Sequence, residues 1–287
     1  MNNYLLPVED GLPMRKAGPW AREKLDYLAR YIAVFGVSMR GKWPVRNYVD
    51  LLAGPGKNRV QGSGQVLLGS PLLALMARYP FTGYYFVELK RANADALRQR
   101  CEAWRGPANV CIQVGDCNKA VDQVVAELAR QGNRSLNLAF LDPEGLELEW
   151  ETVRKLASVR RMDLIINYPQ NGVARSVRKA FLSNGETTLD RFFGDAGWRA
   201  IYDEWRRTRR FSLQRRLIDL YRDRLGALGY VEVQGSDELG DEPLVRNARR
   251  NAPLYRLLFA SKHPLGSTFW HEVTARDVHG QRRLFER

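Results

Sequence analysis

A short apolar run that ends in an acid and two glycines constrains the fold of this chain more than any other feature. Residues 47–56 read NYVDLLAGPG. The apolar part is typical of a buried parallel strand, and Gly54 and Gly56 then allow the backbone to turn sharply and lie close to a bound nucleoside. Asp50, at the strand end, can accept hydrogen bonds from a ribose or an amino group. A glycine motif of this length is weak alone, so the rest of the chain must support it.

Strand patterns alternate with helical patterns over the following residues. Strands are predicted at 46–52, 83–89, 110–114, 136–141 and 163–168, with two more at 230–233 and 254–261. Apolar strands that alternate with helices predict an α/β fold, with a parallel sheet covered by helices on both faces and right-handed crossovers. We therefore expect a Rossmann-like, doubly wound, mostly parallel seven-stranded sheet in which the final two strands form an antiparallel pair at the edge.

The 287 residues are expected to form a single domain. Residues 1–45 are expected to be an N-terminal helical region, with a helix at about 20–37, and residues 46–173 and 211–287 the α/β core. Residues 174–210 are expected to be a basic helical insertion that contains Trp198 and Trp205. Within the core, residues 54–69 are expected to be a loop, Ser70 the N-cap of the next helix, and Gly229 the residue that ends the helix at 213–228.

The net charge of +13 and the pI of 9.9 point to a polyanionic partner such as RNA or DNA. The excess is clustered: one block is Arg206, Arg207, Arg209 and Arg210, and another is Arg246, Arg249 and Arg250. Clustered cations suit phosphate binding because each neutralised phosphate releases counterions. The alternative is that these charge runs form a solvated face.

Cysteine and histidine spacing predicts neither a disulfide framework nor a metal site. Cys101, Cys111 and Cys117 contain no Cys-x-x-Cys pair, and the three histidines are eight residues apart. No apolar run is long enough to span a bilayer, and the N-terminus has no signal-peptide core. We therefore expect a cytoplasmic protein with no membrane partner.

Polar residues stand at the ends of successive predicted strands: Asp50, Glu88, Asp116, Asp142 and Asn167. In an open α/β sheet, ligands bind at the carboxyl ends of the strands. Any one of these acids alone is better explained as a helix N-cap. Four acids at four successive strand ends favour a nucleoside site, because buried carboxylates need partners.

The run from Asp50 to Gly56 resembles the first motif of class I S-adenosylmethionine (SAM) dependent methyltransferases. The resemblance implies that the glycine turn passes the methionine part of SAM, that Glu88 binds its ribose, and that Asp116 approaches its adenine. The cofactor-binding residues so implied are Asp50, Ala53, Gly54, Pro55, Gly56, Glu88, Leu89, Asp116, Cys117 and Asp142. The separation of Asp50 and Glu88 exceeds the usual spacing of about 20 residues, and the loop at 57–69 accounts for the excess.

A wider set of motifs resembles the three-Cys-motif partner protein (TcmP) family over nearly the whole chain. The motifs are Trp20-x-x-Glu23-Lys24-Leu25, Gly69-Ser70-Pro71, Phe86-x-Glu88, Gly115-Asp116-x-Asn118, Leu141-Asp142-Pro143-x-Gly145, Asn167-Tyr168 with Arg175, and Leu257-x-Phe259-Ala-Ser-Lys262-His263-Pro-x-Gly266. The three-cysteine motif of the name belongs to a separate protein, so it does not concern the cysteines here. The resemblance implies a methyltransferase-like fold and a three-Cys-motif protein as a possible partner.

Asp142 is the candidate for orienting or deprotonating the methyl acceptor, with Asn167 beside it. The substrate-binding candidates are Lys57, Ser70, Pro143, Tyr168, Arg175, Arg206, Arg207, Arg209 and Arg210. The sequence after Asp142 is Pro-Glu-Gly, without the aromatic residue that stacks on a flipped base in many base methyltransferases. Tyr168 or Phe192 is the alternative stacking residue. The insertion at 174–210 is expected to be a basic lid over the acceptor or a helical cap on the sheet edge.

Three functions remain open from the sequence. The first is a SAM-dependent methyltransferase acting on RNA or DNA. The second is a SAM-binding, non-catalytic partner of another enzyme. The third is a metal-dependent nuclease that uses Asp50, Glu88, Asp116 and Asp142 as ligands. An NAD-type dehydrogenase is disfavoured because Arg59 stands where the third glycine of the dinucleotide motif would be.

Overall fold

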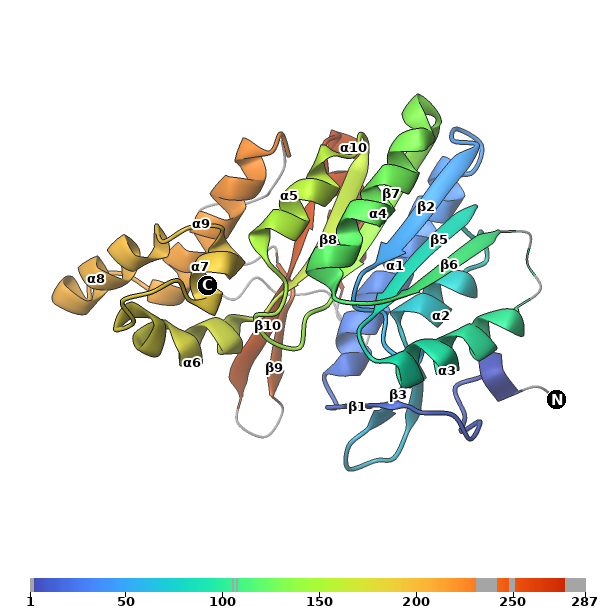
Figure 1. The fold of residues 1–287 in the computed structure, drawn as a ribbon, viewed down its shortest axis with the longest axis horizontal. Coiled ribbons are helices and arrows are strands. Elements are labelled where there is room, and N and C mark those ends of the chain that lie inside the picture. The colour runs from blue at the N-terminus through green and yellow to red at the C-terminus, as the bar shows by residue number, and fades with distance from the viewer. Residues whose placement is uncertain (1–2, 105, 107, 231–241, 248–250, 277–287) are drawn as a thin grey trace.

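A seven-stranded sheet forms the centre of the protein (Figure 1). The computed structural model describes residues 3–104, 106, 108–230, 242–247 and 251–276. In spatial order, the strands are β6 (Asn109–Val114), β5 (Gly83–Glu88), β2 (Val45–Asp50), β7 (Ser135–Leu141), β8 (Met162–Tyr168), β10 (Ala252–Ala260) and β9 (Leu244–Asn247). Strand β10 is antiparallel to both of its neighbours, and the other adjacent pairs are parallel. The expected doubly wound sheet with an antiparallel last strand is confirmed.

Helices cover both faces of this sheet. One face carries α1 (Ala21–Met39), α2 (Ser70–Leu75), α3 (Arg91–Glu102) and α10 (Pro264–Thr274), which share one hydrophobic cluster. The other carries α4 (Cys117–Arg130), α5 (Trp150–Ser158), α6 (Gln170–Phe181), α7 (Thr188–Phe193), α8 (Trp198–Thr208) and α9 (Leu213–Ala227), which share a second. The sheet order reverses direction between β2 and β7, and such a switch point is where open α/β sheets bind ligands.

Helices α7, α8 and α9 form a lobe beyond the β8 and β10 side of the sheet, at the left of Figure 1. Phe192 and Trp198 are buried there. The expected insertion is helical, but α6 already begins at Gln170, directly after β8, instead of at residue 174. The amphipathic pattern of α6 explains the difference, since its buried positions Val173 and Val177 continue the core of the sheet.

A second, three-stranded sheet corrects the expected loop at 54–69. It consists of β1 (Arg15–Ala17), β3 (Lys57–Val60) and β4 (Val66–Leu68), and short 3-10 turns lie at Asn3–Leu5 and Gly132–Arg134. Val60 and Val66 are buried, and glycines with positive φ at 62 and 64 form the turn between β3 and β4. Strand β1 pairs with β3 in parallel, so residues before α1 are not all helical and lie beside the carboxyl edge of the main sheet.

One local prediction needs correction, one falls mostly on residues outside the described ranges, and a third is confirmed. Gly69 is the N-cap of α2, while the Ser70 hydroxyl turns away to donate to Asp50. Most of the strand expected at 230–233 lies outside the described residues, and β10 pairs with β9. Gly229 follows α9 with φ of +85°, as expected for a C-terminal glycine. None of the helices in the described ranges combines the length and the apolar character that crossing a bilayer demands.

Candidate functional site

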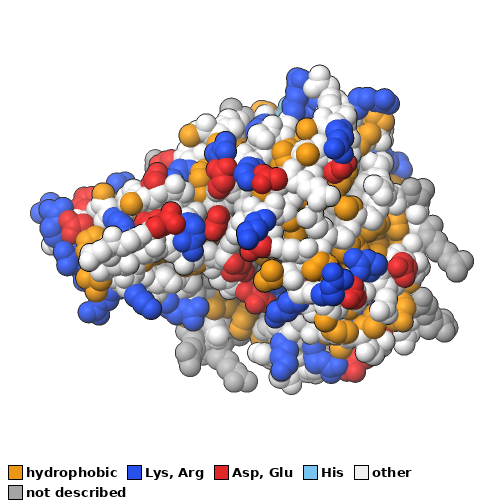
Figure 2. Space-filling model, viewed as in Figure 1, with side chains coloured by type: hydrophobic (Ala, Val, Ile, Leu, Met, Phe, Trp, Pro, Cys, Tyr) orange, Lys and Arg blue, Asp and Glu red, His pale blue; other side chains and the backbone are white. Residues whose placement is uncertain are grey.

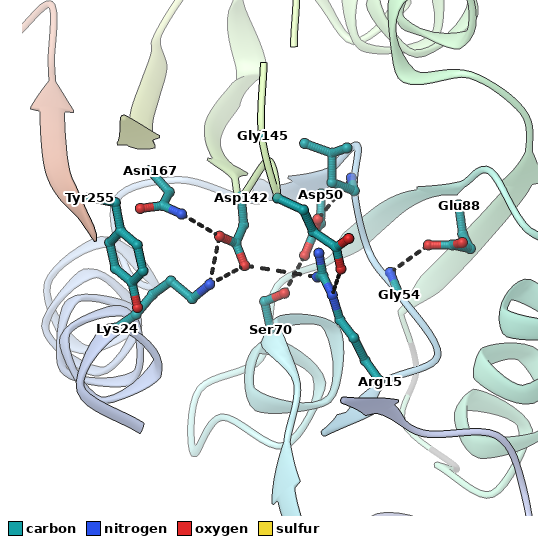
Figure 3. Close-up of polar contacts among 12 residues, drawn as sticks. Arg15, Lys24, Asp50, Gly54, Ser70, Glu88, Asp142, Gly145, Asn167 and Tyr255 are labelled. Atoms are coloured by element: carbon teal, nitrogen blue, oxygen red, sulfur yellow. Dashed lines mark hydrogen bonds and ion pairs between the residues drawn. The ribbon is translucent and has the colours of Figure 1, made fainter. Parts of the chain in front are cut away.

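The predicted strand-end residues lie at one edge of the main sheet (Figure 3). Asp50 and Glu88 are the last residues of β2 and β5, Asp142 directly follows β7, and Asn167 lies near the end of β8. Asp116 is the N-cap of α4, where its side chain accepts from the Asn118 amide. Because parallel strands end at the same edge, residues far apart in sequence meet there.

Asp142 is the centre of a buried polar cluster and is 6% exposed. The Lys24 Nζ of α1 donates to both carboxylate oxygens, at 2.6 and 2.5 Å. The Asn167 side-chain amide donates to Asp142 Oδ1 at 2.8 Å. The Asn167 Oδ1 atom is buried and has no hydrogen-bond partner among the described residues. An unpaired buried acceptor is costly, so this atom is suited to receive a ligand N–H or O–H.

Arg15 lies across the glycine turn, between Asp142 and Glu144. Its Nε donates to Glu144 Oε1 at 2.6 Å, and its Nη1 lies 4.0 Å from Asp142 Oδ2. Burial alone would lower the pKa of Arg15, but the charges of Asp142 and Glu144 raise it above its usual value. A Cβ placed on Gly54 would meet only Arg15 atoms, at 3.9 Å. The Arg15 side chain is therefore the neighbour that faces the open side of this turn.

The glycine turn is held from beneath by Glu88 and Arg100. The Gly54 amide donates to Glu88 Oε2 at 2.9 Å, and Arg100 Nη1 donates to the Pro55 carbonyl at 2.5 Å. Gly54 and Gly56 have φ of +65° and +89°, the left-handed region that favours glycine. A Cβ on Gly56 would also lie 3.0 Å from Leu97. Both glycines are therefore required by the backbone, as the sequence motif predicts.

Asp50 supports the turn from inside the sheet. Its Oδ2 accepts from Ser70 Oγ at 2.6 Å, and its Oδ1 accepts from the Leu52 amide at 3.1 Å. Complete burial raises the pKa of Asp50 from 3.8 to about 7, although these two hydrogen bonds act in the opposite direction. The hydrogen bond between Asp50 and Ser70 therefore stabilises the site from within the core. Of the two, Ser70 lines the cavity beside Asp142 and Asp50 does not.

Lys57 is the clearest correction among the predicted substrate-binding residues. Its side chain is completely buried, with Nζ 2.8 Å from Asp10 Oδ2. The buried Arg100 makes a second ion pair with Asp10, at 2.7 Å. Lys57 thus helps to fix the N-terminal segment to the core and does not reach the site. Asp10, Lys57 and Arg100 lie far apart in the sequence, and no local pattern predicts that they form a buried network.

Two cavities open at this edge, one on each side of Arg15. The Asp142 cavity, about 470 Å³, is lined by Lys24, Ala53, Pro55, Gly56, Ser70, Asp142, Pro143, Asn167, Arg175 and Tyr255 among others. The Glu88 cavity, about 610 Å³, is lined by Leu52, Gly54, Glu88, Leu89, Asn93, Asp116, Cys117 and Glu147 among others. Arg15, Lys16 and Glu144 line both. The structure therefore brings nearly all of the predicted cofactor residues to two adjoining spaces.

The predicted substrate residues separate into three places. Ser70, Pro143 and Arg175 line the Asp142 cavity. Arg206 and Arg209 line a different space, the lobe cavity of about 870 Å³, between α6, α8 and the start of α9. Arg207 and Arg210 are exposed and line neither. Arg175 is the one residue of 174–210 that lines the Asp142 cavity, so the helical lobe is not a lid over it.

Tyr168 and Phe192 are not available for stacking on a substrate base. Both are fully buried, and their ring centroids are 5.6 Å apart in an aromatic cluster with Tyr221. Strand β8 has alternating faces, and Tyr168 turns into the core while Asn167 turns to the cavity. The stacking role expected for either ring is wrong.

Three residues of the site were missed by the sequence reasoning: Arg15, Lys24 and Arg100. Lys24 stands 118 residues before Asp142, and Arg100 stands 45 residues after Pro55. The signal for Lys24 was present in the Trp20-x-x-Glu23-Lys24 motif, which carries a lysine on the amphipathic helix α1. Arg15 and Arg100 have no comparable pattern, since their roles follow from where β1 and α3 pack.

The site fits SAM on the observations of its own residues. Glu88 offers a carboxylate beside the glycine turn, and Leu89 is an apolar side chain left 64% exposed at the Glu88 cavity, as an adenine face would require. In the described residues, no three His, Cys, Asp or Glu side chains come close enough to hold a metal ion.

Comparisons with known proteins find only solved structures of low sequence identity. No protein-family profile matches it, and no curated protein does. The O-methyltransferase TomG of Streptomyces achromogenes, solved in complex with SAM and involved in tomaymycin synthesis, is 12% identical, with 91% of this chain and 94% of that chain covered at a TM-score of 0.41. A Legionella pneumophila protein of family DUF519 is 13% identical over 54% of this chain and 73% of its own, with a TM-score of 0.38.

A conserved hypothetical protein of Streptococcus pyogenes is 17% identical over 48% of this chain and 75% of its own, with a TM-score of 0.31. Identities of 12–17% and TM-scores of 0.31–0.41 say nothing of what this chain does. Membership of the TcmP family stays a prediction, and the functional argument depends on the site itself.

Proposed function

We propose that this protein is a SAM-dependent methyltransferase that acts on a nucleic acid. The observation that carries the proposal is the pair of adjoining cavities at the switch point, one with Glu88 and the exposed Leu89, the other with Asp142, Lys24 and Asn167. The first suits a nucleoside and the second suits an acceptor group. The glycine turn between them is where the two would meet.

The residues of the Asp142 cavity are arranged to orient an acceptor and remove one proton. SAM, when bound, supplies an electrophilic methyl group that carries its own leaving group. The free Asn167 Oδ1 accepts the N–H or O–H of the acceptor, and Asp142 takes the proton that the acceptor loses. Lys24 holds Asp142 in place through both carboxylate oxygens. Catalysis then consists mainly of positioning.

Charge and aromatic side chains beside the cavity support a nucleic-acid acceptor. Figure 2 shows Lys and Arg side chains gathered at the outer end of the helical lobe and along its lower edge. The Arg209 guanidinium carbon lies 3.6 Å from the centre of the Trp205 ring, and that of Arg206 lies 5.2 Å from the Phe181 ring. Cations interleaved with aromatic rings bind phosphates and stack on bases. Helix α6 joins this surface to the Asp142 cavity, because it lines both cavities.

Calorimetric titration with SAM and S-adenosylhomocysteine tests the cofactor site. We expect binding by the full chain, a loss of at least tenfold in affinity for Glu88→Ala, and unchanged affinity for Glu272→Ala, a control on the exposed face of α10. Glu88→Gln removes the charge but leaves a side-chain oxygen that can accept from the Gly54 amide. This variant therefore distinguishes the effect of the charge from the effect of losing the hydrogen bond to the turn. No binding by the full chain would refute the proposal.

Transfer of a labelled methyl group to total RNA and total DNA tests the reaction. Asp142→Asn should retain SAM binding and lose transfer. Binding of SAM without transfer to either pool would instead support the alternative, a SAM-binding partner of another enzyme such as a three-Cys-motif protein.

A further inference from the structure

A fourth cavity lies at the opposite edge of the sheet from the proposed active site. This rear cavity has a volume of about 530 Å³. Leu136, at the start of β7, and Asp163, at the start of β8, form its floor with Ser261, which follows β10. Asp142 lies six residues after Leu136 along the strand, a distance of about 20 Å at 3.3 Å per residue. The rear cavity is therefore separate from the Asp142 and Glu88 cavities.

The walls of the rear cavity are largely apolar. They come from the end of α1, the segment after it, and the first turns of α10, with Phe35, Met39, Trp43, Leu136, Leu265 and Phe269. A space of this volume with apolar walls suits one small organic molecule. Asp163 is the acid in its floor, and both of its oxygens are already engaged, by Ser261 Oγ at 2.7 Å and by Tyr31 OH at 3.3 Å.

Five basic side chains also line the rear cavity, without acidic partners in the described ranges. Lys42, Arg160, Arg161, Lys262 and His263 all line it. The hydrogen bonds of Arg160 and Arg161 go to Asn133, and that of Lys262 goes to the Ala157 carbonyl, which are neutral groups. Across the described ranges, none of the five is ion-paired with a carboxylate. Several arginines elsewhere in the described ranges do have such partners, for example Arg98, Arg130 and Arg154.

We propose that the rear cavity binds a small amphipathic anion, with its apolar body between α1 and α10 and its acidic head among Lys42, Arg160 and Arg161. Apolar burial provides the affinity, and the basic side chains that lack a carboxylate partner select a negative head group over a positive or neutral one. The head chemistry is that of a carboxylate or sulfonate, and the body is either an alkyl chain or a fused aromatic ring. This site is independent of the proposed methyl transfer.

The test uses the full chain and the fluorescent probe 8-anilinonaphthalene-1-sulfonate. We expect saturable binding, displacement by decanoate or by naphthalene-2-carboxylate, and at least tenfold weaker displacement by decyltrimethylammonium, which has the same chain and the opposite charge. The stronger of the two acids identifies the alkyl or the aromatic body. Equal displacement by decanoate and decyltrimethylammonium would overturn the proposal.

Two variants and one control locate the probe. Lys42→Glu should weaken binding at least fivefold, and Leu265→Trp, which fills the cavity from the first turn of α10, should weaken it further. Lys179→Glu makes the same charge change on the exposed face of α6 and should leave binding unchanged. Equal binding by all three variants, or displacement of the probe by S-adenosylhomocysteine, would show that the probe occupies another site and would refute the proposal.

Discussion

At the scale of single residues, Asp142 and the side chains that contact it are the centre of the site. The carboxylate is almost fully buried and has one lysine, one asparagine and a more distant arginine as neighbours. Removing one partner of a buried pair leaves an uncompensated charge, whereas replacing both partners is often close to neutral. The Lys24–Asp142 contact should therefore show strong energetic coupling.

Lys24→Met should lower the free energy of unfolding by about 3 kcal/mol, because it leaves Asp142 without its nearest cation. The double variant Lys24→Met with Asp142→Asn should recover most of that loss. Chemical denaturation of both variants and of Asp142→Asn alone completes the cycle. Additive effects of the two substitutions would contradict the buried pair seen in the structure.

The buried carboxyl of Asp50 predicts a pH dependence of stability. In the folded state its pKa is about 7, against 3.8 for an ordinary aspartate, because burial disfavours the charged form. The folded protein therefore binds the extra proton, and this contribution is fully present below pH 3.8 and is lost as the pH rises through about 7. The difference corresponds to roughly 4 kcal/mol at 1.36 kcal/mol per unit of pKa.

Denaturation curves between pH 4 and 7.5 check this expectation. Asp50→Asn should flatten the decline in stability over that interval, while it keeps a side chain that can accept from Ser70. Part of the slope should remain, since burial also raises the pKa of Asp163 to about 6. If Asp50→Asn leaves the wild-type slope unchanged, the pKa of Asp50 is not raised on folding, and the expectation is wrong.

At the scale of elements, the sequence predicted the main sheet and missed the small one. Strands β5, β7 and β8 are almost continuous apolar runs, which a parallel sheet buried on both faces requires. Strand β3 reads Lys-Asn-Arg-Val and has no such pattern. Strand β3 forms because the buried Asp10 makes an ion pair with Lys57, and because β1 and β4 pair with the two sides of β3. Such long-range pairing is absent from local sequence.

The Asp10 network fixes the N-terminal segment that carries Arg15. Asp10→Ala would leave Lys57 and Arg100 buried without their shared carboxylate and should cost about 3–5 kcal/mol of stability. The neighbouring Glu9→Ala removes only the exposed pair with Arg59 and should cost at most about 1 kcal/mol. Thermal unfolding of the two variants gives a direct comparison. Similar small losses would show that the network contributes little.

At the scale of the whole molecule, strand-end acids and glycines were predictable, but their neighbours were not. The parallel order places Asp50, Glu88 and Asp142 at one edge, as the alternation of strands and helices implies. Arg15 and Lys24 reach the same edge only because β1 and α1 pack over it. Residues 174–210 were expected to be either a lid over the acceptor or a helical cap on the sheet edge, and the position of the lobe follows from burial of Trp198 and Phe192 against α9.

The basic surface should bind nucleic acid in a salt-dependent way. Replacement of Arg178, Arg206 and Arg209 by alanine should reduce the slope of log K against log salt by about 2, at 0.7–0.9 for each phosphate contact. A control triple variant of Arg98, Arg130 and Arg154, which lie on α3, α4 and α5 and not on the lobe, should leave the slope unchanged. Fluorescence anisotropy with a labelled single-stranded oligonucleotide between 50 and 200 mM salt, roughly the range over which such contacts are lost, measures both. Equal slopes would exclude the lobe as the binding surface.

If the proposed function holds, helix α6 sets a length scale for the nucleic-acid strand that is methylated. Asn171 lines the Asp142 cavity and Arg178 lines the lobe cavity. Arg178 lies seven residues after Asn171, which corresponds to about 10 Å of helix at 1.5 Å per residue. A stacked nucleic-acid strand advances about 3.4 Å per nucleotide, so roughly three nucleotides bridge the two cavities. A mononucleotide can occupy one cavity at a time, and only a longer strand is held at the acceptor and at the anchor together.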